Sequence, residues 1–466
     1  MYDSFVQKLH QLPTEYPRDL LPEIAKAHKS RKETIIVLDD DPTGTQTCQD
    51  VIVLTRWDVA LLLEVLKDRP SILFILTNSR SLPEKEAMKL VWQIGINLKK
   101  AIEKLKHNIV VISRSDSTLR GHFPSEVTAI NNALNIMEAI WVVIPAFLEG
   151  GRYTIDDVHY IVENDQLIPV SETQFARDVV FGYQHANLRQ WVEEKTKGMV
   201  LAMDVVSVSL SDLRLGGPGR VMDILKSCHP GDICIINAAS YRDIQVAARG
   251  MLQAESEGME IIYRSSATFV PIRAGLESGK IYIPKQENKT KGKGSLIVVG
   301  SHVPKSTQQL QWLLESGLFQ HIEVKVPEVL KENNDNKVYT IAQQVDNLIN
   351  QGENVVIYTS RKLEVGNDKE ENLHINARVS DYLVRIIQST SIRPYFMLVK
   401  GGITSSDLAS KGLGVTSANV LGPVIPGVPV WCLDDGSKYP GLQYVVFPGN
   451  VGDEAALETV FKKFVN

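Results

Sequence analysis

Short runs of aliphatic and β-branched residues recur along this chain, and each is followed by a polar loop and then by a helical pattern. In the first half of the chain these runs are Thr34–Leu38, Ile72–Leu76, Ile109–Ile112 and Trp141–Ile144. Strands that alternate with helices in this way are typical of parallel sheets joined by crossover helices. The pattern therefore predicts an α/β fold.

The same pattern continues beyond these four runs, and the runs form two sets separated by a segment of different composition. Two runs, Ile233–Asn237 and Glu260–Arg264, extend the first set, and three more follow at Leu296–Val299, Tyr395–Lys400 and Tyr444–Phe447. Between the two sets, KQENKTKGKG at Lys285–Gly294 is polar, basic and rich in glycine, as linkers are, although its lysines could instead hold phosphate. We expect two domains, each with a mainly parallel sheet flanked by helices: a helical extension over residues 1–30, a domain over 31–275, a linker over 276–294 and a domain over 295–466.

Local signals mark some element boundaries. The stretch Ser81–Glu84 resembles a capping box with proline in the first helical turn, and Pro124 precedes a second helix start. Glu163–Asp165 is expected to turn a hairpin, so part of the first domain should not be doubly wound.

Composition excludes several classes of function. The 466 residues are 44% hydrophobic and carry a net charge of −5, which leaves no broad basic surface for nucleic acid. The four cysteines show no CxxC or Cys/His spacing, which argues against a disulfide framework or structural zinc and favours a reducing cytoplasm. No signal peptide is recognisable, and no apolar run approaches the roughly 18 residues that span a membrane.

Charged residues gather in the loops that follow the predicted strands of the first domain. These loops contain Asp39, Asp40, Asp41, Arg80, Arg114, Asp116, Arg120 and Arg152. In an open parallel sheet the ligand binds outside the carboxyl ends of the strands. Arginine can hold a carboxylate or phosphate, and aspartate can accept a hydrogen bond or a proton from a hydroxyl, so a small hydroxylated acid is the expected ligand. The alternatives are structural ion pairs and, for Asp41–Gly44, ordinary turn chemistry.

The predicted second domain carries glycine in three strand-to-helix turns. They are GSHVPKST, GGITSSD and PGNVGDEAA, and each would let backbone N–H groups approach an anion. None matches a Walker motif, and no GxGxxG opens a βαβ unit, which counts against an NAD-linked enzyme. A hydroxy-acid site in one domain and a phosphate cradle in the other suggest phosphoryl transfer.

The motifs also resemble those of a known family. LDDDPTGTQT, TNSRS, RSDSTLRGH and GGRYT resemble the substrate-binding domain of the four-carbon acid sugar kinases, and VVGSHVPKST, KGGITSSD and FPGNVGD resemble their nucleotide-binding domain. The resemblance covers roughly residues 33–456. It implies an ATP-dependent kinase that phosphorylates a hydroxyl of threonate, erythronate or a 3-oxo-tetronate, with Mg²⁺ as cofactor.

The resemblance and the strand-end loops together define a candidate site. Substrate-binding residues are expected at Asp39, Asp40, Arg80, Arg114, Ser115, Asp116, Ser117 and Arg152. The resemblance implies that Arg80 is the arginine that holds the substrate acid. Nucleotide-binding residues are expected at Ser301, Gly401, Gly402, Ile403, Thr404 and Gly449. Asp116 is the candidate general base, with Asp40 as the other catalytic candidate, and the metal ligands are left open.

The expected partners are the sugar acid and ATP, with no nucleic acid and no membrane, and a homodimer is one assembly to test. Two alternatives remain open from the sequence. One is a catalytically inactive regulator that binds both ligands, and the other is a hydroxy-acid dehydrogenase.

Overall fold

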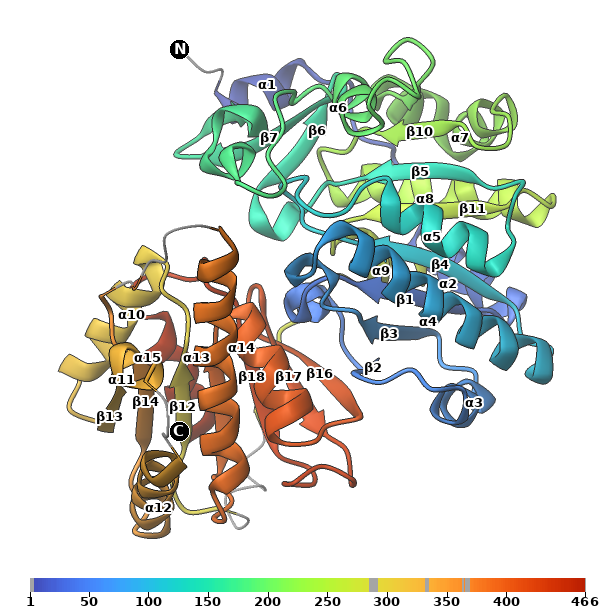
Figure 1. Cartoon of the computed structure of the whole chain (residues 1–466). Coiled ribbons are helices and arrows are strands. Elements are labelled where there is room, and N and C mark those ends of the chain that lie inside the picture. The colour runs from blue at the N-terminus through green and yellow to red at the C-terminus, as the bar shows by residue number, and fades with distance from the viewer. Residues whose placement is uncertain (1–3, 285–291, 332–334, 363, 365–368, 466) are drawn as a thin grey trace. The chain divides into compact units, whose positions relative to one another are not determined.

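A computed structural model describes residues 4–284, 292–331, 335–362, 364 and 369–465. The chain divides into two compact units (Figure 1). The first comprises Met1–Val51 and Arg56–Gly279, and the second comprises Ile52–Thr55 and Lys280–Asn466. Most of the expected linker, Lys285–Lys291, lies outside the described residues.

The first unit is built on a parallel sheet. Its strands follow the order β3 (Ile72–Leu76), β1 (Thr34–Asp39), β4 (Ile109–Arg114), β11 (Ile261–Ser265), β5 (Ile140–Ile144), β10 (Ile233–Ile236) and β9 (Val206–Val208). Every residue of β1 is buried, as expected of a strand that helices cover on both faces. The predicted α/β fold with mainly parallel sheets is therefore confirmed.

Crossover direction decides which helices cover which face of this sheet. Helices α4 (Glu84–Leu105) and α5 (Ser125–Leu134) join strands that advance from β3 to β4 and on to β5, whereas α8 (Tyr241–Ser256) leads back from β10 to β11. Right-handed crossovers then place α8 on the face opposite α4 and α5 (Figure 1). The remaining helices are α1 (Phe5–Gln11), α2 (Leu21–Arg31), α3 (Val59–Lys67), α6 (Leu188–Lys195), α7 (Gly217–Lys226) and α9 (Phe269–Arg273).

The predicted N-terminal extension contains α1 and α2, and α2 packs against α8 and α9. Gly275, with φ +75°, permits this packing, because an added Cβ would lie 2.3 Å from Ala25 Cα. The expected capping box before α4 is wrong. The N-cap is Pro83, which makes no side-chain cap, and Ser81 lies in the preceding turn, where it donates to Asn78 O at 2.7 Å.

A small antiparallel sheet accompanies the parallel one. It consists of β6 (Arg152–Ile155), β7 (Val158–Glu163) and β8 (Gln166–Pro169). The turn residues Asn164 and Asp165 have φ of 50° and 62°, the two positive values of a type I′ hairpin turn. The predicted hairpin is confirmed.

The second unit has a mixed sheet. Its order is β13 (Gln320–Val324), β14 (Val355–Thr359), β12 (Leu296–Val299), β15 (Phe396–Lys400), β18 (Gln443–Phe447), β17 (Val428–Leu433) and β16 (Ser417–Ile425). The first five strands are parallel, and β17 runs antiparallel to β18 and to β16.

One strand of the second unit comes from the early part of the chain. Strand β2 (Val51–Leu54) is the sheet neighbour of β16, and Thr55 N donates to Thr416 O at 3.1 Å. The sequence analysis expected residues 52–55 to belong to the domain at 31–275. Their contacts instead place them with the second unit.

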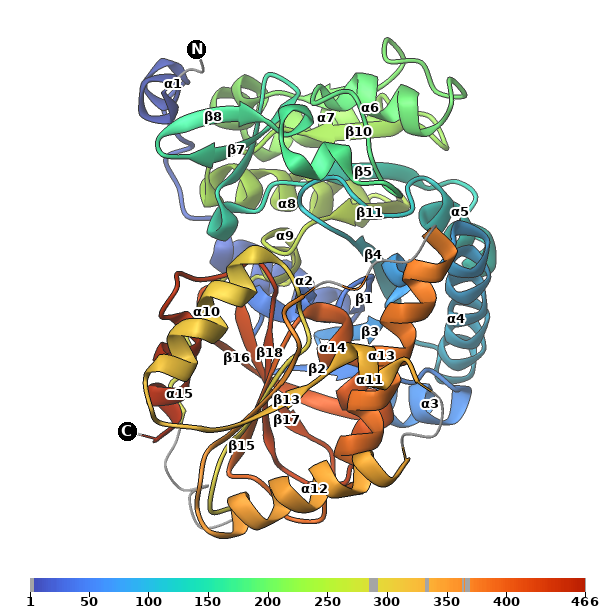
Figure 2. The same ribbon diagram turned by 60° about the vertical axis from the view of Figure 1, so that its left-hand side comes forward.

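Helices cover both faces of the second sheet. Helices α10 (Pro304–Glu315) and α15 (Ala456–Val465) pack together, as do α12 (Asp335–Asn350) and α13 (Lys369–Ser389) (Figure 2). Two short helices complete the unit, α11 (Val326–Val329) and α14 (Gly402–Asp407).

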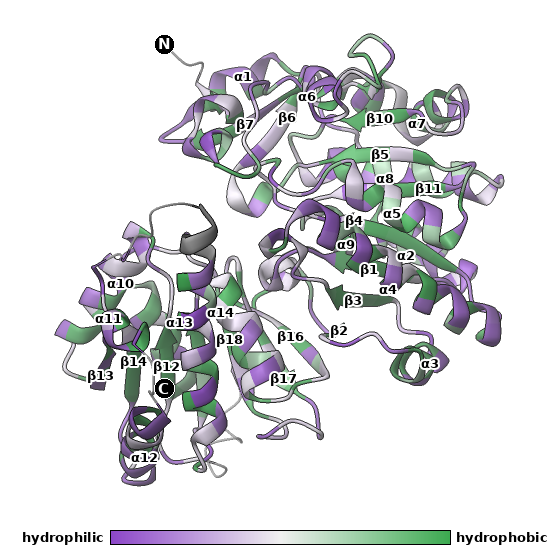
Figure 3. Ribbon diagram, viewed as in Figure 1, coloured by the Kyte–Doolittle hydropathy of each residue, from purple (hydrophilic) through white to green (hydrophobic). Residues whose placement is uncertain are grey.

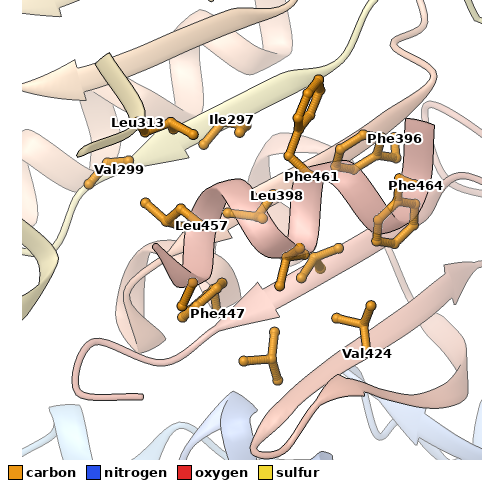
Figure 4. Close-up of a cluster of buried hydrophobic side chains, with 14 of the residues drawn as sticks. Ile297, Val299, Leu313, Phe396, Leu398, Val424, Phe447, Leu457, Phe461 and Phe464 are labelled. Carbon is orange, nitrogen blue, oxygen red and sulfur yellow. The ribbon is translucent and has the colours of Figure 1, made fainter. Parts of the chain in front are cut away.

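The core of this unit lies between α15 and the sheet. Phe461 and Phe464 project from α15 toward Phe396 of β15 (Figure 4), and the rings of Phe396 and Phe464 stack with centroids 4.3 Å apart. Hydropathy follows the same layering, with hydrophobic strands and helices of mixed polarity (Figure 3). Among the described residues, no helix is both long and apolar enough to cross a membrane.

Candidate functional site

Three consecutive aspartates stand where β1 ends. Asp39 is the last residue of the strand, and Asp41 Oδ1 accepts from Thr43 N at 2.9 Å, which caps the turn that follows. Gly44 comes so close that an added Cβ would lie 2.0 Å from Asp39 Oδ2. Asp41 thus performs the expected turn role, and the glycine lets the backbone fold over the carboxylate of Asp39.

Two arginines from neighbouring strand ends lie beside these aspartates. Arg80, from the loop after β3, contacts Asp41 at 2.6 Å and Asp40 at 3.6 Å. Arg114, the last residue of β4, contacts Asp39 at 3.2 Å and Asp40 at 3.8 Å. Because β3, β1 and β4 are adjacent parallel strands, their carboxyl ends bring these charges together.

The aspartates differ in their electrostatics. Burial raises the pKa of Asp39 to about 7, reinforced by Asp40 and Asp41 and only partly opposed by Arg114. Burial also acts on Asp41, but Arg80 and the hydrogen bonds from Thr43 outweigh it and lower the pKa of that carboxyl. Buried oxygens of Asp39 (Oδ2) and Asp40 (Oδ1) have no hydrogen-bond partner among the described residues.

The loop after β4 supplies Ser115, Asp116 and Ser117 of the predicted site. Ser115 Oγ donates to Asp40 Oδ2 at 2.6 Å, and Gly121, with φ +130°, makes room for it, since an added Cβ would lie 2.4 Å from that hydroxyl. The main-chain carbonyl of Ser117 accepts from His159 Nε2 at 2.7 Å. Burial lowers the pKa of His159 to about 4, so the ring is neutral and carries its proton on the nitrogen that faces the carbonyl.

Asp116 lies between two arginines. Its Oδ2 is 2.7 Å from Arg120 Nε and 3.7 Å from Arg80 Nη1, and it also accepts from Thr118 Oγ1. Burial opposes ionisation, but Arg120 and Arg80 outweigh it and hold the pKa of Asp116 well below its usual range. All these contacts fall on Oδ2, and among the described residues no donor to Oδ1 is found.

Arg152, at the start of β6, differs from the other arginines of the site. It forms no ion pair with any carboxylate of the described residues, and its buried Nε has no partner there. Nη1 donates to Gly150 O, and the guanidinium carbon lies 5.9 Å from the centre of the Phe147 ring. Burial lowers the pKa of Arg152, while Asp116 acts in the opposite direction. Arg152 is therefore a cation that forms no ion pair with a carboxylate of the described residues.

Sequence reasoning missed a buried layer behind these loops. Arg264 of β11 donates to Ser113 Oγ at 2.8 Å and to Glu126 Oε2 at 3.2 Å, and Glu126 accepts from Ser79 Oγ. Burial raises the pKa of Glu126 against the pull of Arg264. Both charged residues lie inside regular elements rather than in loops, so no loop motif marked them.

In the second unit, the predicted turns converge on Ser301. Gly401 has φ +118°, and an added Cβ there would lie 3.1 Å from Ser301 Cβ. An added Cβ at Gly449 would lie 3.1 Å from Ser301 Oγ, and Ser306 Oγ bridges Ser301 Oγ at 3.0 Å and Gly449 O at 3.1 Å. Gly402, Ile403 and Thr404 begin α14 directly after Gly401.

Two basic residues beside these turns were not among the predicted site residues. Lys400 is fully buried, and its Nζ donates to Pro448 O at 2.6 Å and lies 4.1 Å from the centre of the Phe447 ring. Burial, with Lys305 nearby, lowers the pKa of Lys400 to about 6. Arg361, after β14, donates to Ser301 O at 2.6 Å. Lys400 lies within the motif KGGITSSD, so its position was a usable signal, whereas no motif marks Arg361.

The side chains of the two units limit which metal ions and anions could bind. No cluster of three or more His, Cys, Asp or Glu that could hold a metal occurs in the part of the chain that the structure describes. Proteins usually bind Mg²⁺ through one or two carboxylates and substrate phosphates, with several waters kept. The glycine turns of the second unit and Arg361, which has no ion-pair partner among the described residues, fit a polyphosphate.

Comparisons with known proteins assign each half of the chain to a domain family. Residues 35–272 match the profile described as a sugar-binding N-terminal domain, and residues 296–457 match the profile described as a nucleotide-binding C-terminal domain. A D-threonate kinase from Salmonella typhimurium strain LT2 is 20% identical over 438 residues, which are 91% of this chain and 96% of the kinase.

Solved structures support the fold. A Haemophilus influenzae protein matches with a TM-score of 0.62 at 16% identity, over 93% of this chain and all of its own. A Salmonella typhimurium LT2 protein matches with a TM-score of 0.66 at 15% identity, over 93% of this chain and 99% of its own. At these identities the likeness concerns the fold alone.

Proposed function

Because this chain belongs to the four-carbon acid sugar kinase family, we propose that it transfers the γ-phosphoryl group of ATP to a hydroxyl of a four-carbon sugar acid. The candidate acceptors are threonate, erythronate and a 3-oxo-tetronate. The observation that carries the proposal is that two complementary groups lie near each other. Arg152 has no ion pair with a carboxylate of the described residues, and Asp116, which acts electrostatically on Arg152, is ionised with all its hydrogen bonds and ion pairs to described residues on Oδ2. A small hydroxy acid presents the two groups that such a pair recognises.

Arg152 would bind the carboxylate of the acid. A charge-assisted hydrogen bond from a guanidinium to a carboxylate is roughly twice as strong as a neutral one, and Arg152 does not have to leave another acid to form it. Arg80 already contacts three aspartates, so its role in this proposal is to hold Asp41, Asp40 and Asp116 in place.

Asp116 would accept the hydrogen bond, and then the proton, of the acceptor hydroxyl. Its low pKa keeps it ionised at neutral pH. Phosphoryl transfer through a loose transition state depends more on the positioning of the reacting groups than on a strong base. Asp40 is the competing candidate, because Ser115 occupies only one of its oxygens.

The acid would bind against the exposed sides of Asp41, Arg80 and Asp116. The cavity beside Ser115, Asp116 and Arg264 has a volume of about 20 Å³, which is space for about one water molecule. Asp41, Arg80 and Asp116 have side-chain exposures of 24%, 18% and 15%, so their outer faces are open to a ligand.

On the nucleotide side, Ser301, Gly401–Thr404 and Gly449 would hold the phosphates through backbone N–H groups. Bound Mg²⁺ would neutralise phosphate charge. We also propose a cytoplasmic location, which is in keeping with four cysteines that form no disulfide in the described structure.

An ADP-release assay with a panel of four-carbon acids tests the proposal. We expect one acid to stimulate ADP release in the presence of ATP and Mg²⁺, and Asp116→Asn to abolish that stimulation. Binding of ADP and an acid without turnover would favour an inactive regulator. A change in nicotinamide absorbance on adding NAD to a hydroxy acid would favour a dehydrogenase.

A further inference from the structure

Arg361 lies at the same edge of the second sheet as the glycine turns. It follows β14, the neighbour of β12, and its Nη2 donates to Ser301 O at 2.6 Å and to Thr307 Oγ1 at 2.8 Å. Ser301 is the residue on which the turns of Gly401 and Gly449 converge. The guanidinium of Arg361 therefore connects Ser301 to the first turn of α10.

The positive charge of Arg361 is not balanced by the described part of the protein. No carboxylate there forms an ion pair with it, and its Nη1 is buried with no hydrogen-bond partner. Burial lowers the pKa of Arg361, and no carboxylate of the described residues opposes that shift. A half-buried cation left in this state costs free energy that an anion in the same place would offset.

The neighbouring lysines also support a site for an anion. Lys400 also has no carboxylate partner among the described residues, and Lys305 lies close enough to lower its pKa. In the first unit, by contrast, Arg80, Arg114 and Arg120 each contact at least one aspartate. In the turns of the second unit, backbone donors thus lie beside Arg361, a cation without a carboxylate partner among the described residues.

We propose that Arg361 binds the phosphate chain of the nucleotide, with Nη1 as the group that reaches the phosphate oxygens. This inference rests on the proposed function, because it takes the ligand to be a nucleoside di- or triphosphate. A planar guanidinium suits that role, since it can hold Ser301 through one nitrogen and a phosphate through another. The competing role is purely structural, in which Arg361 only fixes the Ser301 turn.

Calorimetric titration of the full chain with ADP and with adenosine separates these roles. Three variants are compared. Arg361→Met removes the charge, and Arg361→Lys keeps the charge but not the planar guanidinium. The third variant is Thr307→Val. Thr307→Val is the matched control, because it removes one acceptor that holds Arg361 and leaves the cation in place. Melting temperatures of all variants establish that they are folded.

We expect Arg361→Met to weaken ADP binding by roughly 10- to 100-fold and to leave adenosine binding unchanged, since only the phosphates contact the side chain. Arg361→Lys should fall between Arg361→Met and the wild type, and Thr307→Val should remain within about threefold of the wild type. Arg361→Lys provides the same comparison if Arg361→Met does not fold.

Two results would overturn the inference. One is ADP affinity that both Arg361 variants leave unchanged, and the other is an equal loss for ADP and adenosine, which is the mark of a structural role. Failure of the proposed function looks different, because it appears in the wild-type protein as no phosphoryl transfer to any acid, whether or not ADP binds, whereas failure of this inference appears only in the Arg361 variants.

Discussion

At the scale of single residues, Arg80 and Arg152 are both arginines of one site but have different surroundings. Arg80 lies within 3.7 Å of three aspartates, and Arg152 has no carboxylate partner in the described chain. We expect Arg152→Ala to raise KM for the sugar acid at least tenfold with little change in KM for ATP, because a charge-assisted pair contributes about 1.5–3 kcal/mol.

Arg80→Ala is the matched comparison in the same steady-state kinetics. It should lower kcat more than it raises KM for the acid, since it releases Asp41, Asp40 and Asp116 from their shared partner. The sequence analysis gave the acid-binding role to Arg80. A larger effect of Arg80→Ala than of Arg152→Ala on KM for the acid would restore that assignment.

Asp116→Asn keeps the shape of the side chain and removes its charge. If Asp116 is the base, turnover should fall by at least about two orders of magnitude while ADP and sugar-acid binding persist, the pattern of an interaction made mainly in the transition state. Kinetics at saturating acid, with binding followed by calorimetry, provide the measurement. Lost affinity with nearly normal turnover would instead make Asp40 the better candidate, and Asp40→Asn the next variant.

Lys400 gives a pH dependence with a definite sign. Burial and Lys305 lower its pKa from 10.5 to about 6. Between those values the unfolded chain binds the proton and the folded chain does not, so this residue makes stability rise with pH. Lys400→Met removes the linkage. We expect the variant to melt above the wild type at pH 6, and the difference to shrink as the pH approaches 10.

Thermal unfolding of both proteins without nucleotide at pH 6, 8 and 10 measures this difference. Comparing the two proteins cancels the other groups that titrate in the same range. A difference that stays constant with pH would mean that Lys400 keeps its ordinary pKa in the folded protein.

At the scale of elements, the turn after β15 depends on a glycine with an unusual backbone. Gly401 has φ +118°, and an added Cβ would lie 3.1 Å from Ser301 Cβ. We expect Gly401→Ala to weaken ADP binding strongly, because the methyl group pushes the two turns apart where backbone donors would face the phosphates.

Gly414→Ala is the control for this variant. Gly414 also has positive φ, at +67°, but an added Cβ would meet nothing within 4 Å. Backbone strain alone, about 1–3 kcal/mol, should therefore lower its melting temperature and leave ADP affinity intact. Equal ADP affinities in calorimetry for Gly401→Ala and Gly414→Ala would contradict the proposed role of the turn.

The elements that sequence reasoning identified are those whose signal is local. Strands such as Ile72–Leu76 and Leu296–Val299 are buried on both faces, so they read as continuous apolar runs with the observed bounds. The hairpin of β16 and β17 was missed, although Pro426–Gly427 between them is good turn chemistry. The membership of Ile52–Thr55 in the second unit depends on pairing with residues far away in the chain, which the segment itself does not encode.

In the candidate site, too, the sequence marks residues with a local signal and misses those that depend on distant partners. Loop residues such as Asp40 and Gly401 stand out because their chemistry is unusual at a strand end. Arg264 and Glu126 do not, because a charged residue inside a strand or helix looks like surface until its partner is known. Arg361 lies in a loop, but only its contact with Ser301 relates it to the other turns.

At the scale of the whole molecule, the two units carry complementary chemistry. The first gathers aspartates and arginines that largely neutralise one another and leaves Arg152 without a carboxylate partner among the described residues. The second gathers backbone donors, the buried amine of Lys400 and the cation Arg361, both without a carboxylate partner there. This division matches a sugar-binding domain followed by a nucleotide-binding domain along the chain.

Phosphorus NMR of the reaction mixture tests this central claim most directly. The mixture contains the full chain, ATP, Mg²⁺ and one four-carbon acid at a time, with Asp116→Asn as the control. The account predicts a phosphate monoester signal on one of the acids, formed in equal amount with ADP and absent with Asp116→Asn. ADP accompanied only by inorganic phosphate, or no consumption of ATP with any acid of the panel, would contradict it.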